Sequence, residues 1–80
     1  MPTVVRWIGY RFYFYSHERT EPPHIHVDKA GNSAKFWLDP VALAHNRGYS
    51  DRDLNRLHEK IDEGCDELLR AWHAYFSDNP

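Results

Sequence analysis

The feature that most constrains the fold is an apolar stripe in the C-terminal third of the sequence. Its members recur every three or four positions: Leu54, Leu57, Ile61, Cys65, Leu68, Trp72 and Tyr75. This spacing places them on one face of an α-helix, and Ser50 can cap its first turn. Gly64 costs about 1 kcal/mol inside a helix, but the stripe keeps its phase across it. We therefore predict one helix from about Ser50 to Phe76.

The first half of the sequence is typical of β-strands. The predicted strands cover residues 3–8, 10–15, 24–27 and 33–38, which are rich in β-branched and aromatic residues. Gly9 marks a bulge or bend, and residues 28–32 form a turn, so the last two strands make a hairpin with a longer loop. Residues 41–45 are compatible with a fifth strand or a helical turn. Strands followed by a helix predict an α+β fold, with an antiparallel sheet of four to five short strands covered on one face by a long C-terminal helix.

Length and composition narrow the class of protein. A chain of 80 residues makes one domain, residues 1–80, with a thin core. Cys65 is the only cysteine, so no disulfide forms within the chain, and together with the lack of a secretory signal it predicts a cytoplasmic protein. No apolar run approaches the roughly 20 residues of a membrane helix. A net charge of −2 argues against bulk electrostatic binding to nucleic acid.

Side-chain alternation along the strands predicts two different sheet faces. The apolar face should pack under the helix, and we expect a common core of Phe12, Phe14, Ile25, Val27, Phe36, Leu38, Leu57, Ile61, Leu68 and Trp72. The opposite face, called here the second face, carries Arg11, Tyr13, Tyr15, His24, His26, Lys35 and Trp37. A solvated face strengthened by aromatic cross-strand pairs is the plainest interpretation. Clustered exposed aromatics more often indicate a contact surface.

Three kinds of chemistry fit the second face. Arg11, Tyr13, Tyr15 and Trp37 are of the residue types that anchor protein interfaces. His24 and His26 could instead act as base and acid in RNA cleavage without a metal, with Lys35 or Arg11 on the phosphate. The same aromatics could then stack bases.

A metal site is the third hypothesis for this face. His24 and His26 lie on one side of a strand, and His17 in the preceding loop could complete a three-ligand site of the catalytic zinc type. Lys35 or Arg11 nearby would repel a cation, so we expect no cofactor and little bound metal.

Several motifs together resemble a known family of small bacterial proteins. They are the runs at residues 14–18, 21–27 and 34–38, which include Pro22-Pro23-His24-Ile25-His26-Val27 and Ala34-Lys35-Phe36-Trp37-Leu38, and the late Trp72 with Tyr75-Phe76. The chain resembles the domain of unknown function 4160 over nearly its whole length. That resemblance implies a neighbouring gene for a second small protein, in pairs of toxin–antitoxin type, and no established reaction. His24 and His26 match the family's motif histidines.

Residues and resemblance together give the functional hypothesis. We expect a component of a bacterial toxin–antitoxin-like module that binds a cognate small protein through its histidine–aromatic face. The alternatives are a metal-independent ribonuclease-like toxin using His24 and His26, and a metal-binding enzyme using His17, His24 and His26. RNA and a second copy of the chain are further possible partners, and no membrane is expected.

Overall fold

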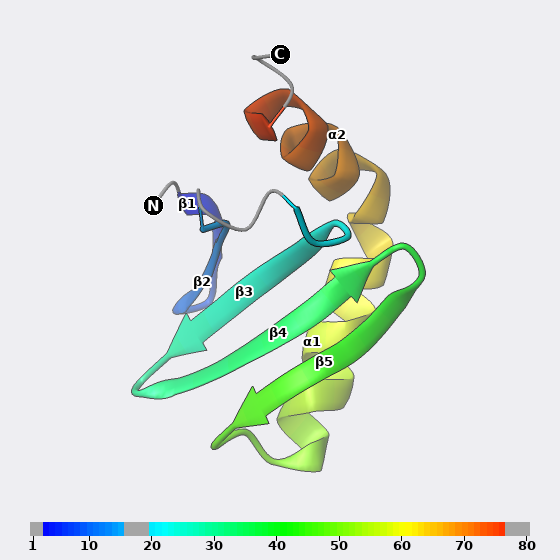
Figure 1. The fold of residues 1–80 in the computed structure, drawn as a ribbon. Coiled ribbons are helices and arrows are strands. Elements are labelled where there is room, and N and C mark those ends of the chain that lie inside the picture. Colours follow the sequence, from blue (N-terminus) through cyan, green and yellow to red (C-terminus); the bar gives the residue numbers. More distant parts are fainter. Residues whose placement is uncertain (1–2, 16–19, 77–80) are drawn as a thin grey trace.

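A computed structural model describes residues 3–15 and 20–76 of the chain. It contains a five-stranded antiparallel sheet with the strands in sequence order, followed by two helices (Figure 1). The elements are β1 Thr3–Trp7, β2 Tyr10–Tyr13, β3 His24–Lys29, β4 Asn32–Leu38, β5 Val41–Arg47, α1 Asp51–Glu63 and α2 Cys65–Phe76. The predicted α+β class is confirmed, and residues 41–45, which the sequence left open, belong to a strand.

Two of the strand connections are tighter than predicted. Ile8-Gly9 joins β1 to β2, and Ala30-Gly31 joins β3 to β4, each as a two-residue turn. All four residues have positive φ, from 38° at Ile8 to 88° at Gly9, as type I′ turns require. The expected longer loop at residues 28–32 is therefore wrong, because Lys29 and Asn32 pair as the last rung of the hairpin.

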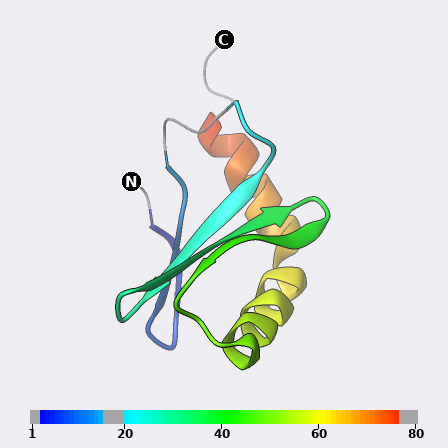
Figure 2. The ribbon, with the colours of Figure 1, turned by 60° about the horizontal axis from the view of Figure 1, so that its bottom comes forward.

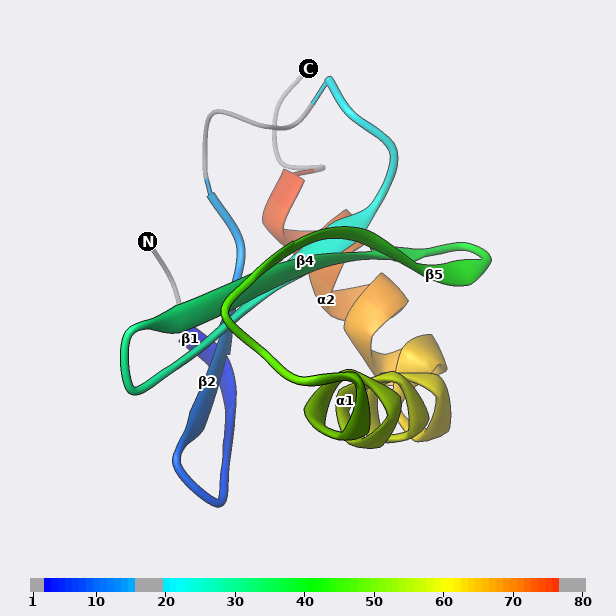
Figure 3. The same ribbon diagram turned by 90° about the horizontal axis from the view of Figure 1, so that it is seen from below.

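The predicted single helix is also wrong, because the chain bends at Gly64. The Gly64 N–H still donates to the Lys60 carbonyl at 3.3 Å, and the Leu68 N–H donates to the Gly64 carbonyl at 2.9 Å. Backbone hydrogen bonding thus continues through the bend, which explains why the apolar stripe keeps its phase. Figure 3 shows α2 leaving the axis of α1 at this point, toward the end of the sheet where Phe14 lies.

The predicted core is confirmed, and both helices lie on one side of the sheet (Figures 2 and 3). All ten expected residues are buried in one cluster. Tyr10 and Tyr49 join it, and the Tyr49 hydroxyl lies 3.2 Å from the Val27 carbonyl, to which it donates. In the described part of the chain, no helix has the length and apolar character that crossing a membrane would require.

Strand β2 ends two residues earlier than predicted. Its pairing with β3 stops at Tyr13 and His26. Beyond that point Phe14 turns to α2, where its ring centroid lies 5.3 Å from that of Trp72. The first residues of β3, which include His24, therefore pair with β4 alone. On its other side, His24 has no neighbour among the described strands.

Candidate binding face

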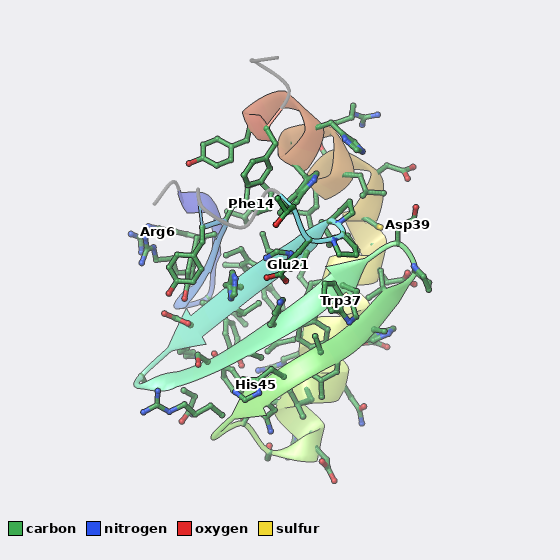
Figure 4. All side chains as sticks on the ribbon, viewed as in Figure 1. Arg6, Phe14, Glu21, Trp37, Asp39 and His45 are labelled. Carbon is green, nitrogen blue, oxygen red and sulfur yellow. The ribbon has the colours of Figure 1, made fainter. Side chains whose placement is uncertain are left out.

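The strand register arranges the second face in rows that run across the sheet. The middle row is Tyr13, His26, Lys35 and His45, each paired with the next on the neighbouring strand. A second row contains Arg11, Asp28, Ser33 and Arg47, and a third contains His24, Trp37 and Ala42. Figure 4 looks onto this face, with Trp37 on β4 and His45 on β5. The predicted site residues that belong to strands all lie together on this face: Arg11, Tyr13, His24, His26, Lys35 and Trp37.

The sequence analysis did not assign His45 and Arg47 to this face. The register between β4 and β5 shifts between Lys35 and Phe36, which pair with His45 and Leu43. Ala44 is the extra residue of this β-bulge, and it puts Leu43 and His45 on opposite faces. Simple alternation would have placed the two on the same side, so no sequence signal assigned them correctly.

His24 is buried, contrary to the expectation of an exposed imidazole. Its exposed fraction is 0%, and its Nδ1–H donates to the Pro22 carbonyl at 2.9 Å. Its ring centroid lies 4.9 Å from that of Trp72 and 5.8 Å from that of Trp37. The register is as predicted, but the loop before β3 and the tryptophan of α2 enclose the ring. His24 therefore holds the Pro-Pro corner in place and has no surface for a substrate.

His26, the second motif histidine, is partly exposed. Its ring stacks on Tyr13 at 5.4 Å with an interplanar angle of 20°, and meets Tyr15 edge-on at 4.6 Å. The His24 ring, 5.1 Å away, meets it at 87°. These contacts fix the orientation of the His26 ring while leaving part of it at the surface. The two motif histidines thus have different environments, and His26 is the one that a partner can touch.

Tyr13 was expected to be a contact residue, but it is only 4% exposed. Its hydroxyl donates to the carboxylate of Asp28, with both oxygens at 3.0 Å. Burial, with Tyr15 and Asp28 adding to it, raises the pKa of the Tyr13 phenol well above its usual value. The Arg11 guanidinium lies over the ring at 4.7 Å. Tyr13 is thus a support beneath Arg11 and His26.

Lys35 is held by two neighbours. Its Nζ lies 2.5 Å from Oε1 of Glu21 and 4.6 Å from the centre of the Trp37 ring. Glu21 comes from the loop before β3 and reaches over the sheet (Figure 4). The expected lone positive charge is therefore half of an ion pair. Glu21 belongs to the motif at residues 21–27 that the sequence analysis singled out, but its pairing with Lys35 was not predicted.

The net charge of the second face is opposite in sign to the net charge of the whole chain. In the described ranges, Arg6, Arg11, Lys35 and Arg47 lie on or beside it, against the carboxylates of Asp28 and Glu21. The chain as a whole has a net charge of −2. Most of the acidic residues are therefore elsewhere, many of them on the two helices.

Comparison with known proteins gives one match. The family model "Domain of unknown function (DUF4160)" matches residues 9–73. The chain belongs to this family. No curated protein matches, and no solved structure matches. The matched range of this DUF4160 protein includes β2 to β5, α1 and most of α2, and therefore nearly the whole second face.

His17, the third ligand of the metal hypothesis for this DUF4160 protein, lies outside the described residues. Within residues 3–15 and 20–76, no three histidine, cysteine or acidic side chains are grouped as metal ligands would be. The metal site stays a prediction that depends on His17.

Proposed function

We propose that this DUF4160 protein is one component of a bacterial toxin–antitoxin-like pair and binds a cognate small protein through its second face. Membership of the family leads us to expect a neighbouring gene for a partner protein, and the second face is the surface on which that partner would bind. The observation that carries the proposal is the set of fixed aromatic and cationic side chains on the side of the sheet opposite both helices. Tyr15, His26, Lys35 and Trp37 are all partly exposed there.

These groups are ordered before any partner arrives. Lys35 is held between Glu21 and Trp37, and His26 is held between Tyr13 and Tyr15. Side chains that are already immobilised lose little conformational entropy on binding. Tryptophan, tyrosine and arginine are also the residues most often found at interface hot spots. The face therefore has both the composition and the rigidity of a binding surface.

The charges indicate the kind of partner surface that fits. A face with an excess of arginine and lysine attracts acidic side chains and speeds encounter with them. Arg11 and Arg47 lie at the two ends of one row, beside the middle row that contains Tyr13 and His26. We therefore expect the partner to present acidic residues around an apolar anchor.

The ribonuclease alternative has less support. A base or acid must reach the proton that it transfers, whereas His24 has no exposed surface. Base stacking needs open aromatic faces, whereas Arg11 and Lys35 already lie over Tyr13 and Trp37. The described histidines of this face that could still supply the acid–base chemistry are His26, which is partly exposed, and His45, which is exposed in the same row.

The direct test is to co-express the chain with the product of its neighbouring gene and measure affinity by calorimetry. Trp37→Ala should weaken the complex by at least about 2 kcal/mol if Trp37 is an anchor, with the fold unchanged by circular dichroism. His26→Gln should weaken it as well. His73→Gln is the matched control, because His73 is exposed on α2, away from the face. Unchanged affinity for both Trp37→Ala and His26→Gln would remove the second face from the interface.

A second assay tests the toxin role. Expression without the neighbour should slow growth, and His26→Gln should relieve that effect. A folded His26→Gln variant that slows growth as much as the wild type would show that this histidine is not the functional centre.

A further inference from the structure

The ammonium of Lys35, in the middle row of the second face, already holds a carboxylate. Its Nζ lies 2.5 Å from Oε1 of Glu21, which belongs to no strand and lies over the sheet (Figure 4). The same oxygen is 4.0 Å from Nδ1 of His24, whose N–H is donated to the Pro22 carbonyl. Among the described residues, Lys35 is therefore the group that holds the Glu21 side chain in this place.

This ion pair can open without any change in the backbone. The side chains of Lys35 and Glu21 are 19% and 38% exposed, and ion pairs in contact with water contribute little to stability. The loop is fixed just after Glu21, because the Leu38 N–H donates to the Pro23 carbonyl at 3.0 Å. The Glu21 carboxylate can therefore leave by rotation about its own side-chain bonds. A competing anion has to overcome only a weak contact.

The groups around Lys35 suit a carboxylate that comes from solvent. Lys35 pairs with His26 on β3 and with His45 on β5, so an imidazole stands on each side of it, about 4.8 Å away across the strands. The Trp37 ring, 4.6 Å from Nζ, fixes the ammonium from a further side. A lysine ammonium has three N–H donors, and each imidazole adds at least one. A carboxylate entering this row would thus meet more donors than Glu21 uses.

We infer that Glu21 occupies, in the isolated chain, the place that an aspartate or glutamate side chain of the partner takes in the complex. The inference rests on the proposed function, and it names the group by which the cognate protein binds Lys35. Two carboxylates beside one ammonium repel each other, so the partner's carboxylate displaces that of Glu21. Binding exchanges one ion pair for another. Glu21 is thus a built-in competitor, which disfavours partners that lack a well-placed carboxylate.

Calorimetry with the neighbouring gene product tests the competition. Glu21→Gln should tighten the complex about two- to fivefold, the range that an exposed ion pair contributes, because the amide keeps the shape but loses the charge. Asp28→Asn is the matched control, since it removes the same charge from the next row of the face without a contact to Lys35. Glu21→Gln should give the larger gain. In a Lys35→Met background, which circular dichroism should show to be folded, that excess should vanish.

Zero-length cross-linking identifies the carboxylate that Lys35 holds. A carbodiimide activates a carboxylate, and a neighbouring amine then forms an amide with it while the reagent leaves as a urea. Peptide mass spectrometry should find a Glu21–Lys35 amide in the isolated chain, and an amide between Lys35 and an acidic residue of the partner in the complex.

The two experiments separate this inference from the proposed function. A complex in which the Glu21–Lys35 amide forms undiminished would overturn the inference and leave the proposed function standing. A Glu21→Gln complex no tighter than that of Asp28→Asn would do the same. Failure of the wild-type chain to bind the neighbouring gene product at all would overturn both.

Discussion

The burial of His24 leads to a quantitative prediction about the first motif histidine. His24→Ala removes a fully enclosed ring and the Nδ1–H that donates to the Pro22 carbonyl at 2.9 Å. Because Pro22 is itself exposed, water can take over its carbonyl, and the loss of this hydrogen bond should cost only about 0.5–1.5 kcal/mol. Removing a buried ring leaves a cavity, and the total for large-to-alanine changes is about 3–5 kcal/mol. We expect a loss of about 2–4 kcal/mol, because the loop at residues 20–23 can partly close the space.

That loss is large for a chain of 80 residues, whose whole free energy of unfolding should be about 4–12 kcal/mol. His24→Asn separates the hydrogen bond from the ring, because the asparagine amide nitrogen can take the place of Nδ1. It should therefore recover about 1 kcal/mol relative to His24→Ala. His26→Gln, at a partly exposed position, should cost less than about 1 kcal/mol.

Urea denaturation followed by circular dichroism provides the measurement, with unchanged m-values as the check on two-state behaviour. The expected order of stability is wild type, His26→Gln, His24→Asn and then His24→Ala. If His24→Ala were no less stable than His26→Gln, the structural role of His24 would be refuted. If His24→Asn were as unstable as His24→Ala, the Nδ1 hydrogen bond would not be the stabilising contact.

Three further perturbations test the turn, the core and the thiol. Ile8 is a β-branched residue at φ 38° and is 56% exposed. Ile8→Asn should therefore relieve backbone strain and raise the free energy of unfolding by about 1 kcal/mol, which should appear as a melting temperature about 4–8 °C higher. Ile8→Val keeps the branched side chain and should give no gain. Ile61 is fully buried, so Ile61→Val should cost about 0.5–1.5 kcal/mol and Ile61→Ala about 2–5 kcal/mol; wild-type melting of Ile61→Ala would contradict its place in the core. Burial, with Asp66 and other acidic neighbours adding to it, raises the pKa of the Cys65 thiol. Less thiolate is therefore present at pH 8, and iodoacetamide should react more slowly with the folded chain than with the chain in urea. Equal reaction rates would show that the fold does not protect the thiol.

The sequence was sufficient to predict the core because the strands that carry it alternate without interruption. From Ile25 to Val27 and from Ala34 to Leu38 every second residue is buried, as simple period-two alternation requires. The helix stripe was equally readable, since hydrogen bonding continues through the bend at Gly64. In each case the relevant signal is local and lies within one element.

The remaining features depend on contacts between distant parts of the chain. His24 is enclosed partly by Trp72, which is 48 positions later in the sequence, and no local pattern predicts that contact. The bulge at Ala44 changes the face on which His45 lies, and an alanine gives no sign of it. The two type I′ turns have glycine at their second position, but Ile8 and Ala30 stand where asparagine or aspartate would signal such a turn.

The second face combines two requirements that usually conflict, exposure to water and a fixed shape. A domain with a single helical layer covers one side of its sheet, so the other side must stay in contact with water unless a partner binds. Here the aromatic and charged groups of the face are neighbours: Lys35 lies over the partly exposed Trp37, Arg11 lies over the buried Tyr13, and the Tyr13 hydroxyl donates to Asp28. Each cation covers apolar ring surface and is itself immobilised by it. The partner proposed above, if it carries carboxylates, would meet these cations without disturbing the rings beneath them.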